Sequence, residues 1–444
     1  MFCQIEEGFM KWRSTRKNCA EVSISDAISM GLAPDGGLFV PVSFPEVDLS
    51  KFSAQMNISQ IAFELMKPFF KGDVLENYLE NICHNAFSFD VPLKKINDNT
   101  FLLELFHGPT AAFKDFGARF LSECFKVLYE KKKATKTILV ATSGDTGGAV
   151  ACAFHKNPGV NVAVLFPLGK VSQRQQAQLT CWGDNVLSFG VSGVFDDCQK
   201  IVKAAFQDQQ FNESLQLTSA NSINVGRLLP QVAYYVAASI WHFSQHQKKP
   251  SFVIPSGNVG NAVGAFWART LGFPIDRIAL ATNANQVIPE YLNHGNWQPK
   301  SSIATLANAM DVGNPSNMER LFDLFENNVD QMRKGCGSLS VSDEIIQKVI
   351  VQKSQNKPDG WGEVICPHTA TAAYYRDQLD QGHWIVVSTA HPAKFDLIVE
   401  PLLNKKIELP ESLSQILNRP THFETIDPHL NSFKLCIEKG FVNE

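Results

Sequence analysis

The chain has 444 residues with a formal net charge of −4 at pH 7, and 44% of its residues are hydrophobic. This length and hydrophobic content suffice for two or three packed domains with substantial cores. The slightly acidic balance argues against a nucleic-acid partner, and no apolar run approaches the length needed to span a membrane. The N-terminal segment also lacks the apolar core of a signal peptide.

The ten cysteines are scattered along the chain without a Cys-x-x-Cys pair. Neither a zinc site nor a disulfide framework is indicated, so we expect no metal. A reducing cytoplasm is the natural compartment for such a chain.

Three parts are predicted along the chain: an N-terminal domain over residues 1–95, a first α/β domain over 96–245, and a second α/β domain over 246–444 that ends in peripheral helices. Strands alternate with helices from about residue 100 to 244, and again from 251 to 394. This alternation predicts parallel sheets flanked by helices on both faces. In such sheets, ligands bind at the carboxyl ends of the strands.

Lys114 lies on a turn that contains Gly108 and Pro109, where an apolar helical pattern begins. The positions at helical spacing are Phe116, Phe120, Leu121, Cys124, Phe125 and Leu128. Lys114 is therefore expected in or next to the first turn of a helix. The positive end of the helix dipole and partial burial both favour a neutral amine, which can condense with an aldehyde. The alternative is a structural or solvated lysine.

A first glycine loop, residues 142–148, lies between the strand candidate 136–141 and a helix of small residues, and the strand candidate 160–166 follows. This order is typical of a βαβ unit and places the loop at a helix N-terminus. Its backbone N–H groups and the hydroxyls of Thr142, Ser143 and Thr146 can converge on an anion such as a substrate carboxylate. An ordinary glycine-rich turn is the alternative.

A second glycine loop repeats this arrangement at residues 255–261, between the strand candidate 251–254 and a helix over 262–271. Its glycines allow the backbone to approach a ligand closely, and the helix start favours a dianionic phosphate. The loop matches neither a Walker A sequence nor a Gly-x-Gly-x-x-Gly fingerprint. A lysine suited to imine formation, one loop for a carboxylate and another for a phosphate together predict a pyridoxal phosphate enzyme.

Six segments extend this pattern along the chain: His107-Gly108-Pro109-Thr110, Ala112-Phe113-Lys114-Asp115, Ser143-Gly144-Asp145-Thr146-Gly147, Asn221-Ser222-Ile223-Asn224, Gly257-Asn258-Val259-Gly260-Asn261 and Thr389-Ala390-His391-Pro392-Ala393-Lys394-Phe395. Residues 14–16 and 31–38 add two more. Through these segments nearly the whole chain resembles threonine synthase of the longer, microbial and fungal type. The resemblance implies the fold of the tryptophan synthase β chain, known as fold type II. It begins at Met10, so the start residue is open between Met1 and Met10, and Lys17 stands where the family pattern has glycine.

The resemblance also implies roles for individual residues. Lys114 matches the lysine that forms a Schiff base with pyridoxal 5'-phosphate, and Thr389 matches the hydroxyl that faces the pyridine nitrogen. Gly257, Asn258, Val259, Gly260 and Asn261 match the loop that holds the cofactor phosphate. Because a threonine cannot pair with the ring nitrogen by charge, more of the proton transfer is left to Lys114.

The segment 221–227 is expected to recognise the substrate. A guanidinium beside hydroxyl and amide donors suits a phosphate, and Ser222 and Arg227 resemble the family's contacts to the substrate phosphate. The carboxylate of the substrate is assigned to Ser143 and Thr146, and Gly144 and Asp145 of the same loop are also expected to bind the substrate. Arg227 in a surface ion pair is the alternative.

The implied activity is the conversion of O-phosphohomoserine and water to threonine and phosphate, the last step of threonine biosynthesis. Two alternatives stay open at this point. One is an O-phosphohomoserine phospho-lyase that releases 2-oxobutyrate, and the other is a protein that binds the cofactor or a phosphate metabolite without turnover. The assembly is open between a monomer and a homodimer.

Overall fold

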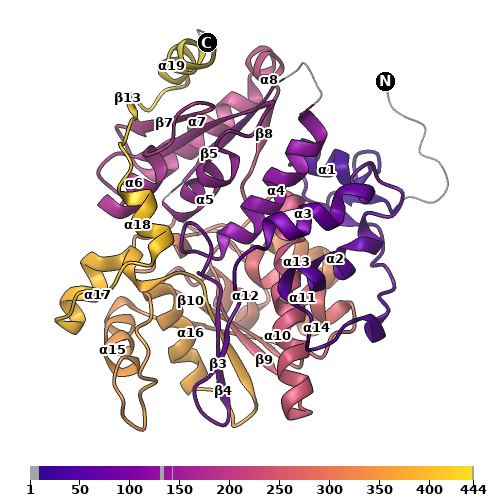
Figure 1. The fold of residues 1–444 in the computed structure, drawn as a ribbon, viewed down its shortest axis with the longest axis vertical. Coiled ribbons are helices and arrows are strands. Elements are labelled where there is room, and N and C mark those ends of the chain that lie inside the picture. The colour runs from indigo at the N-terminus through magenta and orange to yellow at the C-terminus, as the bar shows by residue number, and fades with distance from the viewer. Residues whose placement is uncertain (1–9, 131–134, 143, 443–444) are drawn as a thin grey trace.

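Two β-sheets organise the chain, with a helical N-terminal region packed beside them (Figure 1). The computed structural model describes residues 10–130, 135–142 and 144–442. Met1 lies outside the described residues, and the description begins at Met10. Within these ranges no helix combines the length and apolar character needed to cross a membrane.

The larger sheet has six strands in the order β11-β10-β9-β12-β4-β3. Their bounds are β3 Leu93–Lys95, β4 Thr100–Glu104, β9 Ser251–Pro255, β10 Ile278–Thr282, β11 Cys336–Ser340 and β12 Trp384–Ser388. All neighbouring strands are parallel except β3 and β4, which are antiparallel.

The smaller sheet has five strands in the order β13-β7-β6-β5-β8, and all neighbours are parallel. Their bounds are β5 Lys136–Ala141, β6 Val160–Pro167, β7 Val186–Val191, β8 Leu217–Ser219 and β13 Glu424–Ile426.

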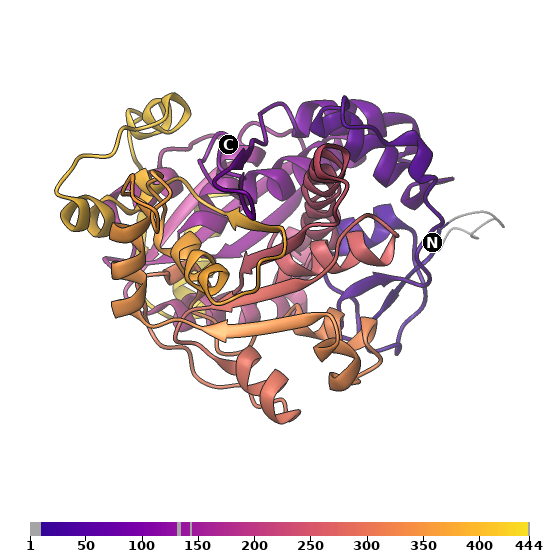
Figure 2. The same ribbon diagram turned by 90° about the horizontal axis from the view of Figure 1, so that it is seen from below.

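Helices surround the strands of each sheet (Figure 2), and the alternation of buried side chains along the strands assigns helices to both faces. In β5, Ile138 and Val140 join the core that contains α4 (Lys114–Tyr129) and α5 (Asp145–Phe154). Leu139, between them, joins a separate core with α7 (Phe195–Gln207) and α19 (Leu430–Val442). Because successive strand residues point to opposite faces, these two cores lie on opposite sides of the sheet.

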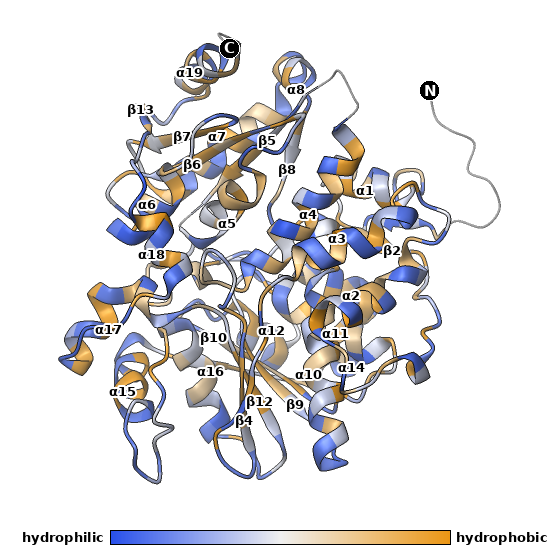
Figure 3. Cartoon of the chain, in the orientation of Figure 1, coloured by the Kyte–Doolittle hydropathy of each residue, from blue (hydrophilic) through white to orange (hydrophobic). Residues whose placement is uncertain are grey.

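The larger sheet follows the same rule. Phe252 and Ile254 of β9 face α10 (Gln231–His246) and α11 (Gly260–Thr270), whereas Val253 faces α16 (Pro367–Asp377). Figure 3 shows the central strands in hydrophobic colours, as expected for strands buried on both faces. The prediction of parallel sheets flanked by helices, with an N-terminal domain, is confirmed.

The remaining helices surround this framework. The N-terminal region contains α1 Ile24–Met30, α2 Ile58–Met66 and α3 Leu79–Ala86, with the short strand pair β1 Trp12–Ser14 and β2 Phe39–Pro41. The others are α6 Gln173–Thr180, α8 Gln209–Leu215, α9 Val225–Leu228, α12 Val287–His294, α13 Met318–Leu324, α14 Val329–Arg333, α15 Asp343–Lys353, α17 Asp396–Leu403 and α18 Glu411–Leu417.

The strand pairing crosses the expected domain limits in three places. β3 ends at Lys95 and pairs with β4, across the limit between the first two predicted domains. β4 precedes α4 in the chain but pairs with β12 of the larger sheet, and β13 pairs with β7 of the smaller one. Sheet membership depends on long-range contacts that the order of strands along the chain does not specify. The division at residues 95 and 245 stays a prediction.

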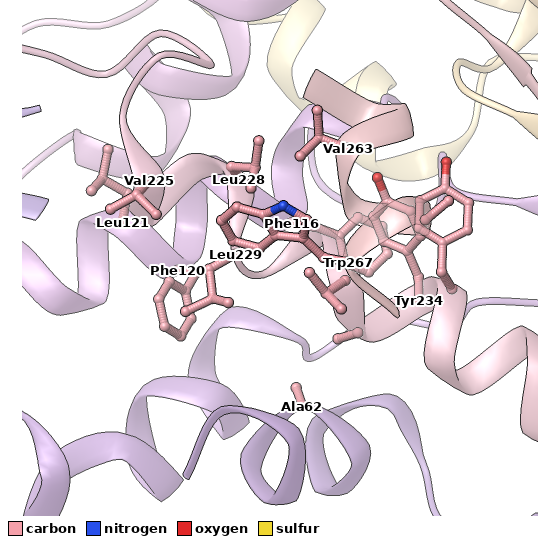
Figure 4. Close-up of a cluster of buried hydrophobic side chains, with 14 of the residues drawn as sticks. Ala62, Phe116, Phe120, Leu121, Val225, Leu228, Leu229, Tyr234, Val263 and Trp267 are labelled. Atoms are coloured by element: carbon pink, nitrogen blue, oxygen red, sulfur yellow. The ribbon is translucent and has the colours of Figure 1, made fainter. Parts of the chain in front are cut away.

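One buried cluster holds the helices that carry the predicted site (Figure 4). Its labelled side chains are Ala62, Phe116, Phe120, Leu121, Val225, Leu228, Leu229, Tyr234, Val263 and Trp267. They come from α2, α4, α9, α10 and α11 and the short link between α9 and α10. Interlocking of this kind resists relative movement, so the helix starts at Lys114 and Gly260 are fixed with respect to one another.

Candidate active site

A cavity of about 330 Å³ lies where β5, β9 and β12 end. Of the predicted site residues, those that line it are Lys114, Asp145, Thr146, Ser222, Arg227, Gly257, Asn258, Val259, Gly260, Asn261 and Thr389. Gly144 does not line it, and Ser143 lies outside the described residues. A larger hollow of about 810 Å³ near Thr100 and Lys353 contains none of the predicted residues.

Lys114 is the first residue of α4, as the helical pattern predicted. Its Nζ lies 6.0 Å from the centre of the Phe113 ring and forms no hydrogen bond or ion pair with any described residue, so the amine faces the cavity free of polar partners. Burial lowers the pKa of Lys114 to about 8, the charge of Asp145 opposes this change, and those of Lys394 and Arg227 add to it. About a tenth of the amine is therefore neutral at pH 7, far more than for a lysine with its ordinary pKa.

The turn before Lys114 is fixed by the carboxylate of Asp115. That carboxylate accepts hydrogen bonds from the backbone N–H of Thr110 at 2.8 Å and from its hydroxyl at 2.6 Å. A Cβ at Gly108 would lie 2.5 Å from the Asp115 carboxylate, so the turn requires glycine there. The same turn leads to Phe113, whose N–H donates to the carbonyl of Thr389 at 2.8 Å.

The loop between β9 and α11 presents a continuous set of unused donors. None of the backbone N–H groups from Gly257 to Ala262 donates a hydrogen bond to a described residue. Val259 has a φ of 65°, a left-handed conformation that is strained for a β-branched side chain. Such strain and unpaired donors at a helix N-terminus are typical of a phosphate-binding site.

Asn261 adds a side-chain donor to this loop. Its Oδ1 accepts from the hydroxyls of Tyr234 at 2.5 Å and Tyr235 at 2.7 Å, which orients the amide. Its buried Nδ2 has no partner among the described residues. A phosphate would satisfy these donors, so the residues present fit pyridoxal phosphate.

Ser222 lies against the same loop and has one remaining donor. Its Oγ accepts from Nδ2 of Asn258 at 2.8 Å and from Nδ2 of Asn317 at 3.1 Å. Because both lone pairs are used, the hydroxyl hydrogen is left to donate to a ligand. The fully buried Arg320 fixes this segment by donating to the carbonyl oxygens of Ser222 and Ile223.

Arg227 is buried in α9 and lines the cavity. One Nη donates to the carbonyl of Ala220, and the buried Nε has no partner among the described residues. Burial lowers the pKa of Arg227 to about 10, so the guanidinium keeps its charge at neutral pH. It makes no ion pair within the described ranges, which contradicts the alternative of a surface ion pair.

The loop before α5 is used differently from the sequence expectation. The hydroxyl of Thr142 accepts from the N–H groups of Gly144 at 3.0 Å and Gly147 at 2.9 Å, so it caps its own loop. The N–H groups of Asp145 and Thr146 have no partner among the described residues. Gly144 has a conformational role in the loop. Its φ of 141° favours glycine, and a Cβ there would lie 2.5 Å from the side chain of Gln175.

Sequence reasoning assigned no role to two residues of this region. Lys394 forms a buried ion pair with Asp145 at 2.9 Å. His368 lines the cavity, accepts from the N–H of Ala309 through Nε2 at 3.1 Å, and is neutral because burial lowers its pKa to about 4. A lysine between alanine and phenylalanine was a weak signal for burial of Lys394, and no signal identified His368.

Comparisons with known proteins agree with this geometry. The family model described as pyridoxal-phosphate dependent enzyme matches residues 90–387. Models for the threonine synthase N terminus and the threonine synthase C-terminal region match residues 11–87 and 368–437. A threonine synthase from Buchnera aphidicola (subsp. Acyrthosiphon pisum) is 38% identical over 96% of this chain and 99% of its own.

Solved structures give the same result. The crystal structure of threonine synthase from Escherichia coli has a TM-score of 0.88 and 35% identity, covering 97% of this chain and 100% of its own. A threonine synthase from Brucella melitensis with bound PLP has a TM-score of 0.89 and 29% identity, covering 97% and 99%. Because the family models match most of its residues and these relatives share its fold over nearly its full length, the chain belongs to the threonine synthase family of pyridoxal-phosphate dependent enzymes.

Proposed function

We propose that the cavity converts O-phosphohomoserine and water to threonine and phosphate. The observation that carries the proposal is the grouping of three anion-binding sets of donors around one unpaired amine. These sets are the N–H groups from Gly257 to Ala262, the first turn of α5, and the pair Ser222 and Arg227. The proposed reaction involves three anions, namely the cofactor phosphate, the substrate carboxylate and the leaving phosphate.

Pyridoxal phosphate supplies an aldehyde and an electron-withdrawing ring that acidifies the carbons of a bound amino acid. The residues proposed to hold it are Lys114, the loop from Gly257 to Asn261, and Thr389. The Thr389 hydroxyl has no hydrogen-bond partner among the described residues, so it is available to a ring nitrogen. Lys114, with a pKa of about 8, is suited to accept a proton at Nζ and return it.

The substrate is proposed to lie between the two sheets. Its carboxylate is proposed to accept hydrogen bonds from the unpaired N–H groups of Asp145 and Thr146, and Ser143 is also assigned to this contact. Its phosphate is proposed to accept hydrogen bonds from the hydroxyl of Ser222 and the guanidinium of Arg227, which orient the leaving group. The buried Val259 and the partly buried Ile223 line the cavity and limit the access of water to the reacting carbons.

A product assay tests this function. Purified protein loaded with pyridoxal phosphate is supplied with O-phosphohomoserine, and phosphate, threonine and 2-oxobutyrate are measured together. Equal amounts of phosphate and threonine are expected. A yield of 2-oxobutyrate in place of threonine would support the phospho-lyase, and absence of phosphate release would contradict both enzymes. The relatives' names favour the synthase.

We also propose a cytoplasmic location. The nine cysteines within the described ranges are free thiols, which fits a reducing compartment. Assembly as a monomer or a homodimer is compatible with the proposed chemistry, because every residue assigned to a described ligand contact lies in one chain.

A further inference from the structure

A buried ion pair beside the cavity links the segment after β12 of the larger sheet to the segment after β5 of the smaller sheet. Lys394 lies in the short helix η5 (Pro392–Phe395) after β12, and Asp145 begins α5 after β5. Their Nζ and Oδ1 atoms are 2.9 Å apart, and the side chains are 1% and 4% exposed. Since the two residues follow strands of different sheets, their contact fixes the relative position of both sides of the cavity.

The position of Asp145 conflicts with anion binding unless its charge is compensated. The first turn of α5 offers two unpaired N–H groups to a substrate carboxylate, and a carboxylate side chain stands in that same turn. Two like charges in a buried site repel one another strongly. An uncompensated Asp145 would therefore compete with the substrate for the helix dipole.

The environment of Asp145 shows how this conflict is resolved. Although burial alone would raise the pKa of the Asp145 carboxyl, the ammonium of Lys394 holds it well below its usual range, with Lys114 and His368 contributing. Lys394 also donates to the carbonyl oxygen of Thr110 at 2.7 Å. Its ammonium is therefore fixed between the turn before Lys114 and the first turn of α5.

We infer that Lys394 is a positioning residue that neutralises Asp145, so that the first turn of α5 accepts the carboxylate of an amino-acid substrate. The inference rests on the proposed function for the location of that carboxylate. The Lys394–Asp145 pair also acts on Lys114. Because the two charges are opposite, their effects on the pKa of the Lys114 amine largely cancel. Removing either partner alone changes this field in a direction set by the remaining charge.

Single variants test the inference by the sign of their effects. In the cofactor-loaded protein, Lys394→Met leaves the charge of Asp145 uncompensated. The affinity for L-homoserine should fall at least about tenfold, and the pH midpoint of the cofactor's visible absorbance should rise. Asp145→Asn leaves the charge of Lys394 instead, so the midpoint should fall and L-homoserine binding should be equal or tighter.

A ligand control isolates the carboxylate. 3-Aminopropan-1-ol has the amine and hydroxyl of homoserine but no carboxylate. Its affinity, measured by the same spectral titration, should change less than about threefold in Lys394→Met. An equal loss for both ligands would overturn the inference.

The double variant Asp145→Asn/Lys394→Met separates charge compensation from a purely structural contact. With both charges removed, homoserine affinity and the absorbance midpoint should return toward the values of the unmodified protein. A structural contact predicts that both single variants shift the readouts in the same direction and that the double variant is no better than Lys394→Met; that result would overturn the inference. If Lys394→Met is insoluble, Asp145→Asn and the double variant still show in which direction the homoserine affinity and the absorbance midpoint change.

Failure of the proposed function has a different signature. L-Homoserine binding requires no turnover, so the test applies even if the unmodified protein releases no phosphate from O-phosphohomoserine. Absent phosphate release with the expected opposite shifts would reject the reaction and keep the carboxylate site. Normal threonine formation, with both single variants shifting the readouts in the same direction, would keep the proposed reaction and reject the role of Lys394.

Discussion

The two glycine loops at the cavity follow the same strand–loop–helix plan but offer different binding chemistry. The loop before α11 carries no charged side chain, and its N–H groups from Gly257 to Ala262 are all unused by the described residues. The loop before α5 uses the Thr142 hydroxyl to occupy two of its N–H groups, and it contains the compensated carboxylate of Asp145. This difference suits the loop before α11 to a dianion such as a phosphate, and the loop before α5 to a monoanion such as a carboxylate.

This difference fits the residence time of the proposed ligands. A cofactor phosphate stays bound through many turnovers, so many donors and a strained Val259 are tolerated there, at a cost of order 1–3 kcal/mol for the strain. A substrate carboxylate must leave after each turnover, and two N–H groups beside a compensated charge bind it less tightly. The ligand of a glycine loop is therefore inferred from the N–H groups that the loop leaves unpaired, and not from its glycines alone.

The largest expected effect concerns the amine between the loops. Lys114→Ala should lower turnover by about 10³-fold or more, since both the covalent attachment and the proton transfer are lost. Because the cofactor phosphate is assigned to backbone N–H groups of the loop before α11 and not to this side chain, the variant should still bind pyridoxal phosphate without a covalent bond. Borohydride reduction followed by mass spectrometry measures the attachment. A covalent cofactor adduct on another lysine would show that Lys114 is not the attachment site.

Arg227→Lys tests the third set of donors, which belongs to neither loop. A bidentate guanidinium contact to phosphate is worth roughly 1.5–3 kcal/mol, so kcat/KM for O-phosphohomoserine should fall about 10- to 150-fold. The visible spectrum of the bound cofactor should be unchanged, and homoserine binding should be little affected.

Arg269→Lys is the matched control for this variant, because Arg269 also donates to backbone carbonyl oxygens but lies outside the cavity. It should lower stability without changing turnover per folded molecule. If both arginine variants lose turnover to the same extent, Arg227 has no special role in phosphate recognition.

Much of the site followed from local sequence. The apolar pattern after Lys114 placed it at a helix start, and the strand and helix patterns around both loops placed them at helix N-termini. Local signals of this kind depend on hydrogen bonding and burial within about 20 residues, which a single sequence displays. The resemblance then indicated that these separate segments serve one ligand set.

The remaining features depend on contacts between distant segments. The pairing of Lys394 with Asp145 joins two sheets, and nothing near either residue specifies its partner. The left-handed conformation of Val259 opposes its intrinsic preference and persists because the surrounding structure imposes it. The membership of β4 in the larger sheet is of the same kind.

A pair of glycine variants sharpens the comparison of the two loops. In Gly257→Ala the new Cβ would lie 2.6 Å from the backbone Cα of Met310, so the loop must shift. Cofactor affinity, measured by equilibrium dialysis, should fall at least about tenfold, or about 1.4 kcal/mol. In Gly148→Ala the nearest atom is 3.3 Å away on a side chain, and cofactor affinity should stay the same. Equal losses in both variants would contradict the assignment of the phosphate to the second loop.

The smallest effect is expected at the ends of the strands opposite both loops. There, Nε2 of His242 lies 2.9 Å from Nδ1 of His383, and Nδ1 of His242 lies 3.0 Å from the carbonyl of Lys248. His242 must donate to that carbonyl, so its Nε2 is the acceptor, and protonation there would break the contact. Burial lowers the pKa of His242 to about 4, with the neighbouring His246 and His383 adding to the change.

Because the folded state binds the proton less readily than the unfolded state, this histidine lowers stability as the pH falls from about 6.5 to about 4. Above pH 6.5 the neutral His242 contributes fully to the free energy of unfolding. Urea unfolding at pH 7.5 and pH 5 should show a loss of about 1–2 kcal/mol in the unmodified protein that is smaller in His242→Gln. The exposed His294→Gln should leave the loss unchanged. The loop proposed to hold the cofactor phosphate follows the opposite end of β9, so cofactor affinity per folded molecule should not differ between the two variants. An equal loss of stability in the unmodified protein and both variants would assign the acid sensitivity to other groups.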